Sequence, residues 1–126
     1  MENFAIVRPE HLNHHGYLFG GALLKWVDEF AWMAASRDYR GCTLVTIGMD
    51  EIVFRNRVGN GAILRFVIDR IRRGTTSVTY RVDVHSDEPG AVAERPVFTT
   101  TVTFVRVDST GAKCPLPDDP DPSTTS

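Results

Sequence analysis

The stretch from Gly20 to Ala35 is mostly apolar and carries one aspartate, Asp28, in its middle. The spacing of the apolar residues predicts one long helix that starts at the glycines and ends near Ser36 or Arg37, with Gly41 beyond it as a stop. A helix that is apolar on most sides must be covered on most sides. The rest of the chain must therefore supply that cover.

Five other segments have the composition and alternation of β-strands, and they cover residues 4–7, 44–49, 63–72, 76–85 and 97–107. In the clearest of them, Val78, Tyr80, Val82 and Val84 point to one side and polar residues to the other, which predicts one buried face. Turn signals at Asn60-Gly61, Arg73-Gly74 and Pro89-Gly90 are short enough to join antiparallel neighbours directly. We expect an α+β fold in which one antiparallel sheet curls around one long central helix.

The length and composition are those of one domain. A chain of 126 residues with 42% hydrophobic content can bury about two-thirds of its unfolded surface. We place the domain at residues 1–110. The end of the chain, residues 111–126, is rich in proline and aspartate and is expected to be a disordered tail.

Charge, hydropathy and cysteine content argue against several functions. The net charge is −2, from 14 basic and 16 acidic residues without a polybasic run, so we expect no nucleic-acid partner. The longest apolar stretches are shorter than the roughly 18 residues that span a bilayer, so we expect no membrane segment. Cys42 and Cys114 follow no metal-binding spacing and occur without a leader sequence, which indicates reduced thiols in a cytoplasmic protein.

Asp28 is the first candidate for chemistry because its neighbours on the predicted helix are small or apolar. The residues within about 60° of it on a helical projection are Gly21, Leu24, Ala31, Trp32 and Ala35. Burial of an unpaired carboxylate is costly, so such a group is paired, protonated or functional. The alternative to a functional role is an ion pair with Lys25 or a distant arginine. The adjacent Glu29 lies about 100° further around the helix and is expected to face solvent or Lys25.

Hydrogen-bonding side chains and glycines precede the helix, from Asn13 to Gly21. The first amides of a helix have no partner within it and attract negative charge. A helix start built on Gly20 and Gly21 can therefore stabilise a carbonyl oxygen that becomes negative in a transition state. The simpler interpretation is a tight turn packed on the core.

The spacing between the glycines and the aspartate predicts an oligomer. The seven residues from Gly21 to Asp28 separate the two by about 10 Å along a helix axis. A base or nucleophile must come within about 3 Å of its target, so one substrate cannot contact both features of one chain. Two copies arranged about a twofold axis would bring the glycine loop of one against the middle of the other's helix. We therefore expect at least a homodimer with two shared sites.

The segment from Asn13 to Asp28 resembles the signature of acyl-CoA thioesterases of the hotdog fold. The matching positions are Asn13, Gly16, Phe19, Gly20, Gly21, Leu24 and Asp28, with looser matches at Phe54, at Gly61, in the turn 74–77 and in the last strand at 103–108. The resemblance implies a sheet wrapped around one long helix and a dimer that often assembles into a hexamer. It also implies that an acyl-CoA substrate is hydrolysed to free acid and CoA in a cleft between subunits.

The resemblance also implies a role for each matching residue. Asp28 is the general base or nucleophile, and Asn13 of the facing subunit orients water or substrate. Amides at the helix start polarise the thioester carbonyl. The substrate-contacting positions are Gly16, Phe19, Gly20 and Gly21. We add His15, which we expect to line the entrance to the cleft or to hydrogen-bond its own loop.

The resemblance also implies CoA contacts at the turn that follows the third predicted strand. The residues concerned are Arg72, Arg73, Gly74, Thr75 and Ser77. Two interpretations of Arg72 and Arg73 have equal weight. Either they bind CoA phosphates by charge-assisted hydrogen bonds, or they are solvated residues of a hairpin turn.

No metal or redox cofactor is expected. His11, His14 and His15 form the only histidine cluster, and the sequence supplies no further ligands at a suitable spacing. Three other functions stay open. One is an enoyl-thioester hydratase that uses His15 and Asp28 on the same fold. The others are a non-catalytic acyl-CoA binding or sensing module and a purely structural dimer.

Overall fold

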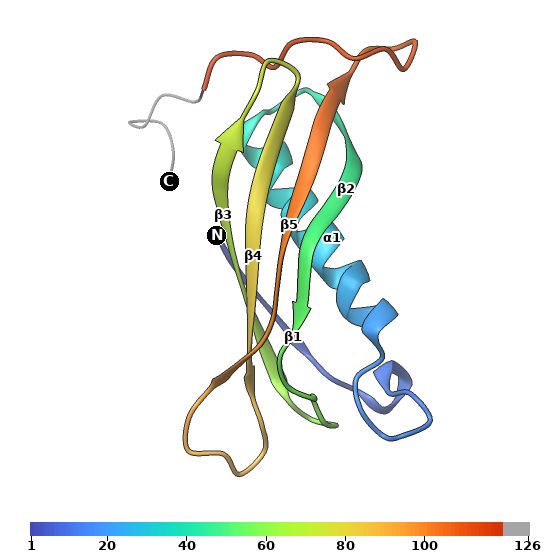
Figure 1. The fold of residues 1–126 in the computed structure, drawn as a ribbon, viewed down its shortest axis with the longest axis vertical. Helices are drawn as coiled ribbons and strands as arrows, with labels where there is room; N and C mark the ends of the chain where they lie inside the picture. Colours follow the sequence, from blue (N-terminus) through green and yellow to red (C-terminus); the bar gives the residue numbers. More distant parts are fainter. Residues whose placement is uncertain (120–126) are drawn as a thin grey trace.

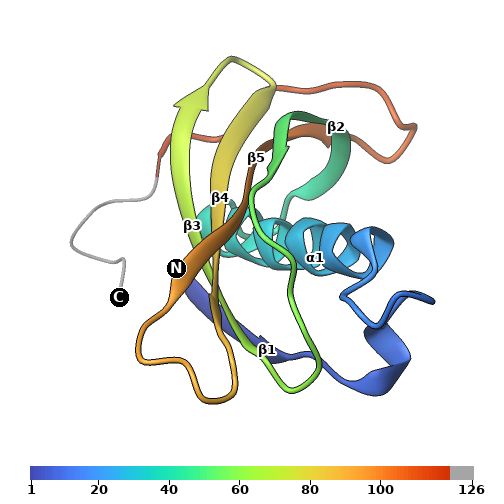
Figure 2. The ribbon, with the colours of Figure 1, turned by 60° about the horizontal axis from the view of Figure 1, so that its bottom comes forward.

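One antiparallel sheet of five strands wraps around a single long helix in the computed structural model of the chain, which describes residues 1–119 (Figures 1 and 2). The helix α1 spans Gly20–Asp38, and a 3-10 turn, η1, spans Pro9–His11. The strands are β1 (Glu2–Ile6), β2 (Thr43–Phe54), β3 (Ile63–Arg73), β4 (Ser77–Asp87) and β5 (Arg95–Val107). The predicted α+β architecture is confirmed.

The strand order differs from the expected chain of hairpins. The order across the sheet is β1-β3-β4-β5-β2, and every neighbouring pair is antiparallel. The turns at Arg73-Gly74 and Pro89-Gly90 do join neighbours, but the turn at Asn60-Gly61 does not. β3 pairs with β1 on the side away from β4, so β2 pairs with β5 and forms the opposite edge.

The buried face of the sheet packs against one side of α1. The helix residues that face the sheet are Leu23, Val27, Ala31, Ala34 and Ala35, all buried. The alternation predicted for β4 is confirmed, because its residues Val78, Tyr80, Val82 and Val84 are also buried. Phe66 of β3 lies at the centre, with its ring edge-on to Phe30 at 4.9 Å and to Trp26 at 6.3 Å between ring centroids.

The other side of α1 is left uncovered by residues 1–119. Lys25 and Glu29 are exposed there, and the large ring of Trp32 is 44% exposed. The sequence predicts cover on most sides, and the described residues supply it on the sheet side only. No helix within residues 1–119 has both the length and the apolar character needed to cross a membrane.

The start of α1 depends on a close approach between Phe19 and Gly21. Phe19 is the N-cap residue and makes no side-chain capping bond, while its carbonyl accepts the amides of Ala22 and Leu23 at 3.0 and 3.2 Å. Its ring folds back over the helix, where a Cβ on Gly21 would lie 2.5 Å from the ring. Any larger residue at position 21 would displace this ring.

The edge strand β2 is longer than predicted and exposes apolar side chains. The sequence predicts an end at Met49, but bulges beside Ile47 and at residues 51–52 carry the strand on to Phe54. The carbonyl of Asp50 at the second bulge accepts hydrogen bonds from Thr100 and Thr101 of β5. The exposed large apolar residues of this strand are Val45, Ile47, Ile52, Val53 and Phe54. An apolar edge of this kind favours pairing with another strand.

The beginning of the expected disordered tail is packed on the domain, which corrects that expectation for residues 111–119. Leu116 is 7% exposed, and its amide donates to the carbonyl of Thr75 at 2.8 Å. The amide of Cys114 donates to the carbonyl of Arg106 at 3.0 Å. Leu116 thus packs on the core, a contact that amino-acid composition alone does not predict. Residues 120–126 lie outside the described residues.

Replacement of Phe66 by alanine should destabilise the domain by about 3–5 kcal/mol, because it leaves a cavity between α1 and the sheet. Urea unfolding at one fixed protomer concentration measures the change. The control is Val92→Ala at a fully exposed position, which should change stability by at most about 0.5 kcal/mol. Equal effects of the two substitutions would contradict the packing described above.

Candidate functional site

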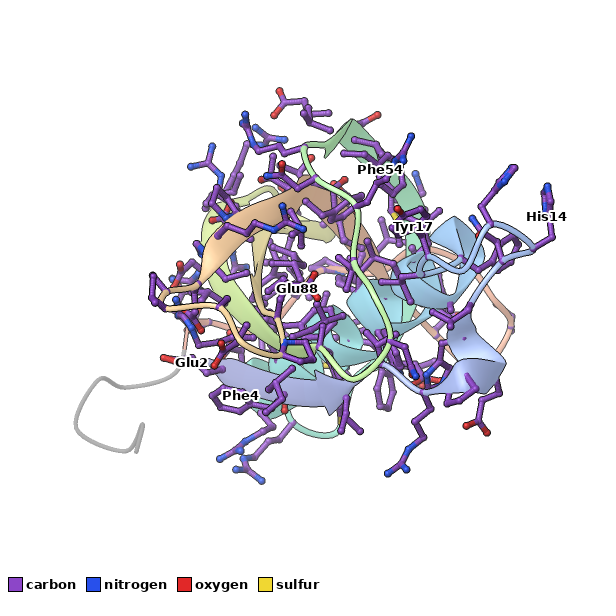
Figure 3. All side chains as sticks on the ribbon, turned by 90° about the horizontal axis from the view of Figure 1, so that it is seen from below. Glu2, Phe4, His14, Tyr17, Phe54 and Glu88 are labelled. Carbon is purple, nitrogen blue, oxygen red and sulfur yellow. The ribbon has the colours of Figure 1, made fainter. Side chains whose placement is uncertain are left out.

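A cleft of about 620 Å³ opens at the end of the molecule where α1 begins (Figure 3). It lies between the loop before α1, the first turn of the helix and the segment that follows β2. Its lining residues are Asn13, His15, Tyr17, Leu18, Gly20, Leu23, Phe54, Arg55, Asn56, Arg57, Val58 and Val97. The volume is within the range of small-molecule sites, and three of the predicted site residues, Asn13, His15 and Gly20, line it.

Asn13 organises the loop before α1. Its Oδ1 accepts the amides of His15 at 2.9 Å and Tyr17 at 3.2 Å, and its backbone amide donates to the carbonyl of Tyr17 at 2.7 Å. Gly16 closes the turn with a φ of 84°, a conformation that favours glycine. Because its side-chain oxygen already accepts two hydrogen bonds, the side-chain nitrogen, Nδ2, of Asn13 is the group that can donate to a ligand in the cleft.

The first amides of α1 are free to bind a negatively charged oxygen. Within residues 1–119, the amides of Gly20 and Gly21 have no hydrogen-bond acceptor. Gly20 lines the cleft, and a Cβ there would lie 3.8 Å from the ring of Phe54. Phe19 is 57% exposed and covers Gly21, so of the two glycines only Gly20 lines the cleft.

Asp28 lies outside this cleft, on the border between the uncovered side of α1 and the edge strand β2. Its Oδ1 accepts a hydrogen bond of 2.7 Å from the hydroxyl of Thr46. No ion pair among residues 1–119 includes Asp28, so the alternative of a pair with Lys25 or an arginine is not observed there. The carboxylate is partly exposed in a single chain, whereas the sequence analysis assumes that it is buried.

The turn with the predicted CoA contacts lies at the opposite end of the sheet from the cleft (Figure 1). β3 starts at Ile63 near the cleft end and carries the chain over 11 residues to Arg73, a length of about 35 Å. The turn itself is closed by the amide of Gly74, which donates to the carbonyl of Ser77 at 2.8 Å. Arg72, Arg73, Gly74, Thr75 and Ser77 therefore cannot reach the cleft of their own chain.

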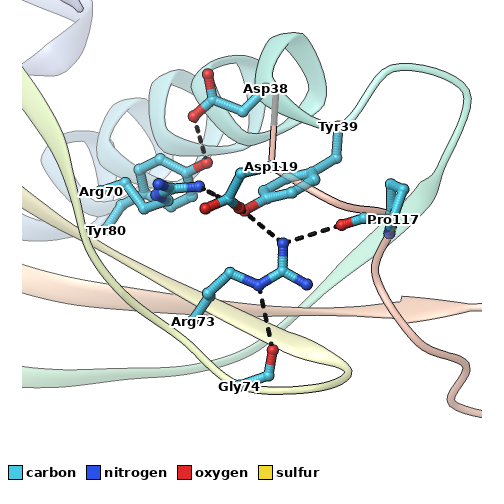
Figure 4. A network of polar contacts seen from close by, with 8 residues as sticks. All are labelled: Asp38, Tyr39, Arg70, Arg73, Gly74, Tyr80, Pro117 and Asp119. Carbon is cyan, nitrogen blue, oxygen red and sulfur yellow. Dashed lines mark hydrogen bonds and ion pairs between the residues drawn. The ribbon is translucent and has the colours of Figure 1, made fainter. Parts of the chain in front are cut away.

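Arg73 is held in a network with the end of the described chain (Figure 4). Asp119 accepts hydrogen bonds from Arg73 at 2.7 Å, from Arg70 at 2.8 Å and from the hydroxyl of Tyr39 at 3.1 Å. The hydrogen bonds from Arg73 and then Arg70 lower the pKa of the Asp119 carboxyl to about 2. Burial is the main cause that raises the pKa of Tyr39. These contacts give Arg73 a role within the chain.

A second tyrosine completes this polar cluster. The hydroxyl of Tyr80 donates to Asp38 at 2.7 Å, and burial, followed by this hydrogen bond, raises the pKa of Tyr80 well above its usual range. The pair joins the last turn of α1 to β4. It lies far from the cleft and serves to anchor the helix end.

The described chain does not bring together a metal site. No group of three or more histidine, cysteine, aspartate or glutamate side chains with the geometry to hold an ion occurs in residues 1–119. The ring of His11 instead packs edge-on to Trp26 at 4.6 Å, and its Nδ1 accepts the amide of Arg8. His14 and His15 contact each other, with ring centroids 3.8 Å apart. The absence of a metal cofactor stays a prediction.

Several site residues are missed by the sequence analysis. Thr46 is one, because no local pattern shows that a strand residue contacts a helix residue 18 positions earlier. The far wall of the cleft, residues 54–58, is another. It begins at Phe54, the last residue of β2, and the sequence predicts no strand beyond Met49.

A family model described as "Thioesterase superfamily" matches residues 15–93 of this chain. The chain is 33% identical to mouse acyl-coenzyme A thioesterase 11 over 79% of its own length and 17% of that protein's. It is 32% identical to an uncharacterized acyl-CoA thioester hydrolase of Bacillus subtilis over 88% of its own length and 64% of that protein's. The chain thus spans less than two-thirds of the length of either relative.

Solved structures share the fold over nearly the whole chain. A hexameric hotdog fold thioesterase of Campylobacter jejuni has a TM-score of 0.81 and 30% identity, covering 91% of this chain and 88% of that one. An acyl-CoA hydrolase of Staphylococcus aureus, solved with butyryl coenzyme A and coenzyme A, has a TM-score of 0.83 and 28% identity, covering 93% of this chain and 71% of that one. The S. aureus protein has also been solved as three variants, in which an aspartate, an asparagine or a threonine is replaced by alanine. The expected hotdog fold is confirmed.

The network around Asp119 predicts an unusually acidic carboxyl. Carboxyl NMR of the wild-type chain should give a titration midpoint near pH 2, and Arg73→Gln should move it toward the ordinary value of about 3.9. Because the pKa is lowered in the folded state, its stabilising contribution is present above about pH 4 and is lost as the pH falls through about 2. Arg72→Gln is the neighbouring control and should leave the midpoint unchanged. A wild-type midpoint near 3.9 would rule out the network.

Proposed function

This chain belongs to the thioesterase superfamily, and we propose that it hydrolyses acyl-CoA thioesters to a free carboxylic acid and CoA. The observation that carries the proposal is that the hydrogen-bond donors and the carboxylate lie at different places on one chain. The cleft offers hydrogen-bond donors, Asn13 and the amide of Gly20, and no carboxylate from the described residues 1–119 lines it. The carboxylate of Asp28 is held by Thr46 on the uncovered side of α1, about two turns further along the helix. A hydrolytic site needs both kinds of group on one substrate.

A homodimer would bring these groups together. Two chains related by a twofold axis, with their α1 helices antiparallel, place the start of one helix against the middle of the other. Three features support this contact: the free edge of β2, its exposed apolar residues Val45 and Ile47, and the exposed ring of Trp32 beside Asp28. Two shared sites result, each with Asn13 and Gly20 from one chain and Asp28 from the other. We extend the proposal to a hexamer built from three such dimers, as the name of the C. jejuni protein suggests.

The chemistry follows from these positions. The thioester carbonyl oxygen accepts a hydrogen bond from the amide of Gly20, which stabilises the negative charge that develops on it. Asp28 acts in one of two ways. As a general base it takes a proton from water, and the resulting hydroxide attacks the carbonyl. As a nucleophile it attacks the carbonyl itself to give an anhydride that water then hydrolyses. In the first case Asp28 passes the proton it has taken from water to the leaving thiolate of CoA; in the second case the thiolate leaves first and takes its proton from the water that hydrolyses the anhydride. Asn13 orients the water or the substrate.

Thr46 is assigned a positioning role in this mechanism. Its hydroxyl donates to one oxygen of Asp28 at 2.7 Å and leaves the other oxygen for water or substrate. The three variants of the S. aureus hydrolase replace the same residue types as Asp28, Asn13 and Thr46. The asparagine and the aspartate of that protein stand at the same spacing along the chain as Asn13 and Asp28. This agreement in residue type and spacing supports Asn13 and Asp28 as site residues, and for Thr46 the agreement is in residue type alone.

The remaining parts of the proposal are the reaction's requirements and location. No metal or redox cofactor is needed, because a carboxylate and helix amides supply the acid–base and electrostatic parts of the reaction. Cys42 and Cys114 are free thiols in the described part of the chain, which supports a cytoplasmic protein.

Asp28→Asn should lower kcat for butyryl-CoA hydrolysis at least about 100-fold, because the variant lacks the base or nucleophile. Release of free thiol measures the reaction. Glu29→Gln is the matched control on the next position and should retain activity. Thr46→Ala should lower kcat, and Thr46→Ser, which keeps the hydroxyl, should restore it. Near-normal turnover in Asp28→Asn together with an inactive Glu29→Gln would reverse the assignment. With an enoyl-CoA as the substrate, a change in the absorbance of the enoyl group without thiol release would indicate a hydratase instead.

A further inference from the structure

A second cleft of about 540 Å³ adjoins the first and shares part of its wall. Tyr17, Arg55, Asn56 and Arg57 line both clefts. The far side of the second cleft is lined by Glu88, in the loop between β4 and β5 (Figure 3), and by Arg95, at the start of β5. A ligand in the first cleft can therefore extend into the second without leaving the surface of one chain.

The second cleft carries an excess of positive charge. Three arginines, Arg55, Arg57 and Arg95, face one carboxylate, Glu88. That carboxylate is already used within the fold, since Glu88 accepts hydrogen bonds from the amide of Gly59 at 3.3 Å and from the hydroxyl of Ser86 at 3.1 Å. Its contact with Arg95 is long, at 3.4 Å. Glu88 thus fixes the walls of the cleft and only partly neutralises it.

Arg57 and Arg95 are held in place, and the charges of Arg55 and Arg57 stay available to a ligand. The guanidinium of Arg57 lies over the ring of Tyr17, with 5.0 Å from its central carbon to the ring centroid. Arg95 donates to the carbonyl of Arg57 at 2.6 Å, which fixes the backbone of that segment. Within residues 1–119, neither Arg55 nor Arg57 forms an ion pair. A guanidinium that is positioned by stacking loses less freedom when it binds an anion.

We propose that the cleft formed by Arg55, Arg57 and Arg95 binds an anionic group of the substrate, a phosphate or a carboxylate, while the thioester lies in the first cleft. This inference rests on the proposed thioesterase function. It also assigns the anion to different arginines from those expected from the sequence. Arg73 is bound to Asp119, and its turn lies at the other end of the sheet, whereas Arg55 and Arg57 line the site itself.

The anion has two possible sources on an acyl-CoA. One is a phosphate of the CoA portion, and the other is a terminal carboxylate on the acyl chain. Three probes separate them: butyryl-CoA carries phosphates only, succinyl-CoA carries phosphates and a carboxylate, and the butyryl thioester of N-acetylcysteamine carries neither.

The test measures binding apart from turnover. Calorimetry gives the Kd of each probe for the Asp28→Asn protein and for the same protein with Arg57→Gln or Arg55→Gln added. The matched control is Arg40→Gln, an exposed arginine at the other end of α1. Thiol release by the wild-type protein is measured separately, so that loss of the anion site and failure of the proposed hydrolysis are distinguished.

Loss of Arg57 or Arg55 should weaken the binding of butyryl-CoA and succinyl-CoA at least about tenfold if the anion is a phosphate. Succinyl-CoA alone should be affected if it is the acyl carboxylate. The N-acetylcysteamine thioester and all Arg40→Gln values should be unchanged. The proposal is overturned if the two CoA probes bind the arginine variants as they bind the parent, if neither binds the parent, or if the uncharged probe weakens equally. Weakened CoA binding without thiol release from wild-type protein would keep the anion site and end the thioesterase proposal.

Discussion

A helix rises by about 1.5 Å per residue, so the amides at the start of α1 and the carboxylate of Asp28 are held about 10 Å apart. No side-chain rotation closes that distance within one chain. The fold adds to the constraint, because the sheet covers one side of α1 and leaves Asp28 on its border, beside Trp32. In the proposed mechanism a single chain therefore presents two halves of a site, and each half needs the other half from a second chain. The proposed hydrolase is in this sense a property of the dimer.

The edge strand β2 connects the fold to this requirement. It supplies Thr46, which holds Asp28, and it exposes the backbone edge and apolar side chains that a second chain can cover. The strand ends at Phe54, which lines the first cleft, and the segment that follows it carries Arg55 and Arg57, which line both clefts. One strand thus positions the carboxylate and offers the dimer contact, and the segment after it carries two of the arginines assigned to the anion. The opposite end of the sheet is closed by the network of Asp119, Arg70 and Arg73.

Local features of the sequence predict the helix and the strands well, but contacts between distant residues cannot be predicted from it. The limits of α1 follow from its apolar spacing and from Gly20 and Gly41, and the buried face of β4 follows from its alternation. The pairing of β2 with β5 cannot be found this way, because it depends on which edges are free once β1 has paired with β3. The same limit hides the bond from Thr46 to Asp28. Composition also predicts disorder for residues 111–119, whereas Leu116 packs on the domain and Asp119 accepts a hydrogen bond from Arg73.

Mixing two inactive variants tests most directly whether each site is shared between chains. Asn13→Ala and Asp28→Asn proteins are unfolded together and refolded, so that their chains associate at random. The proposed arrangement gives each mixed dimer one site that carries both changes and one that carries neither, and about a quarter of the wild-type thiol release should return. Activity of the mixture no higher than that of the separately refolded variants would contradict a site built from two chains.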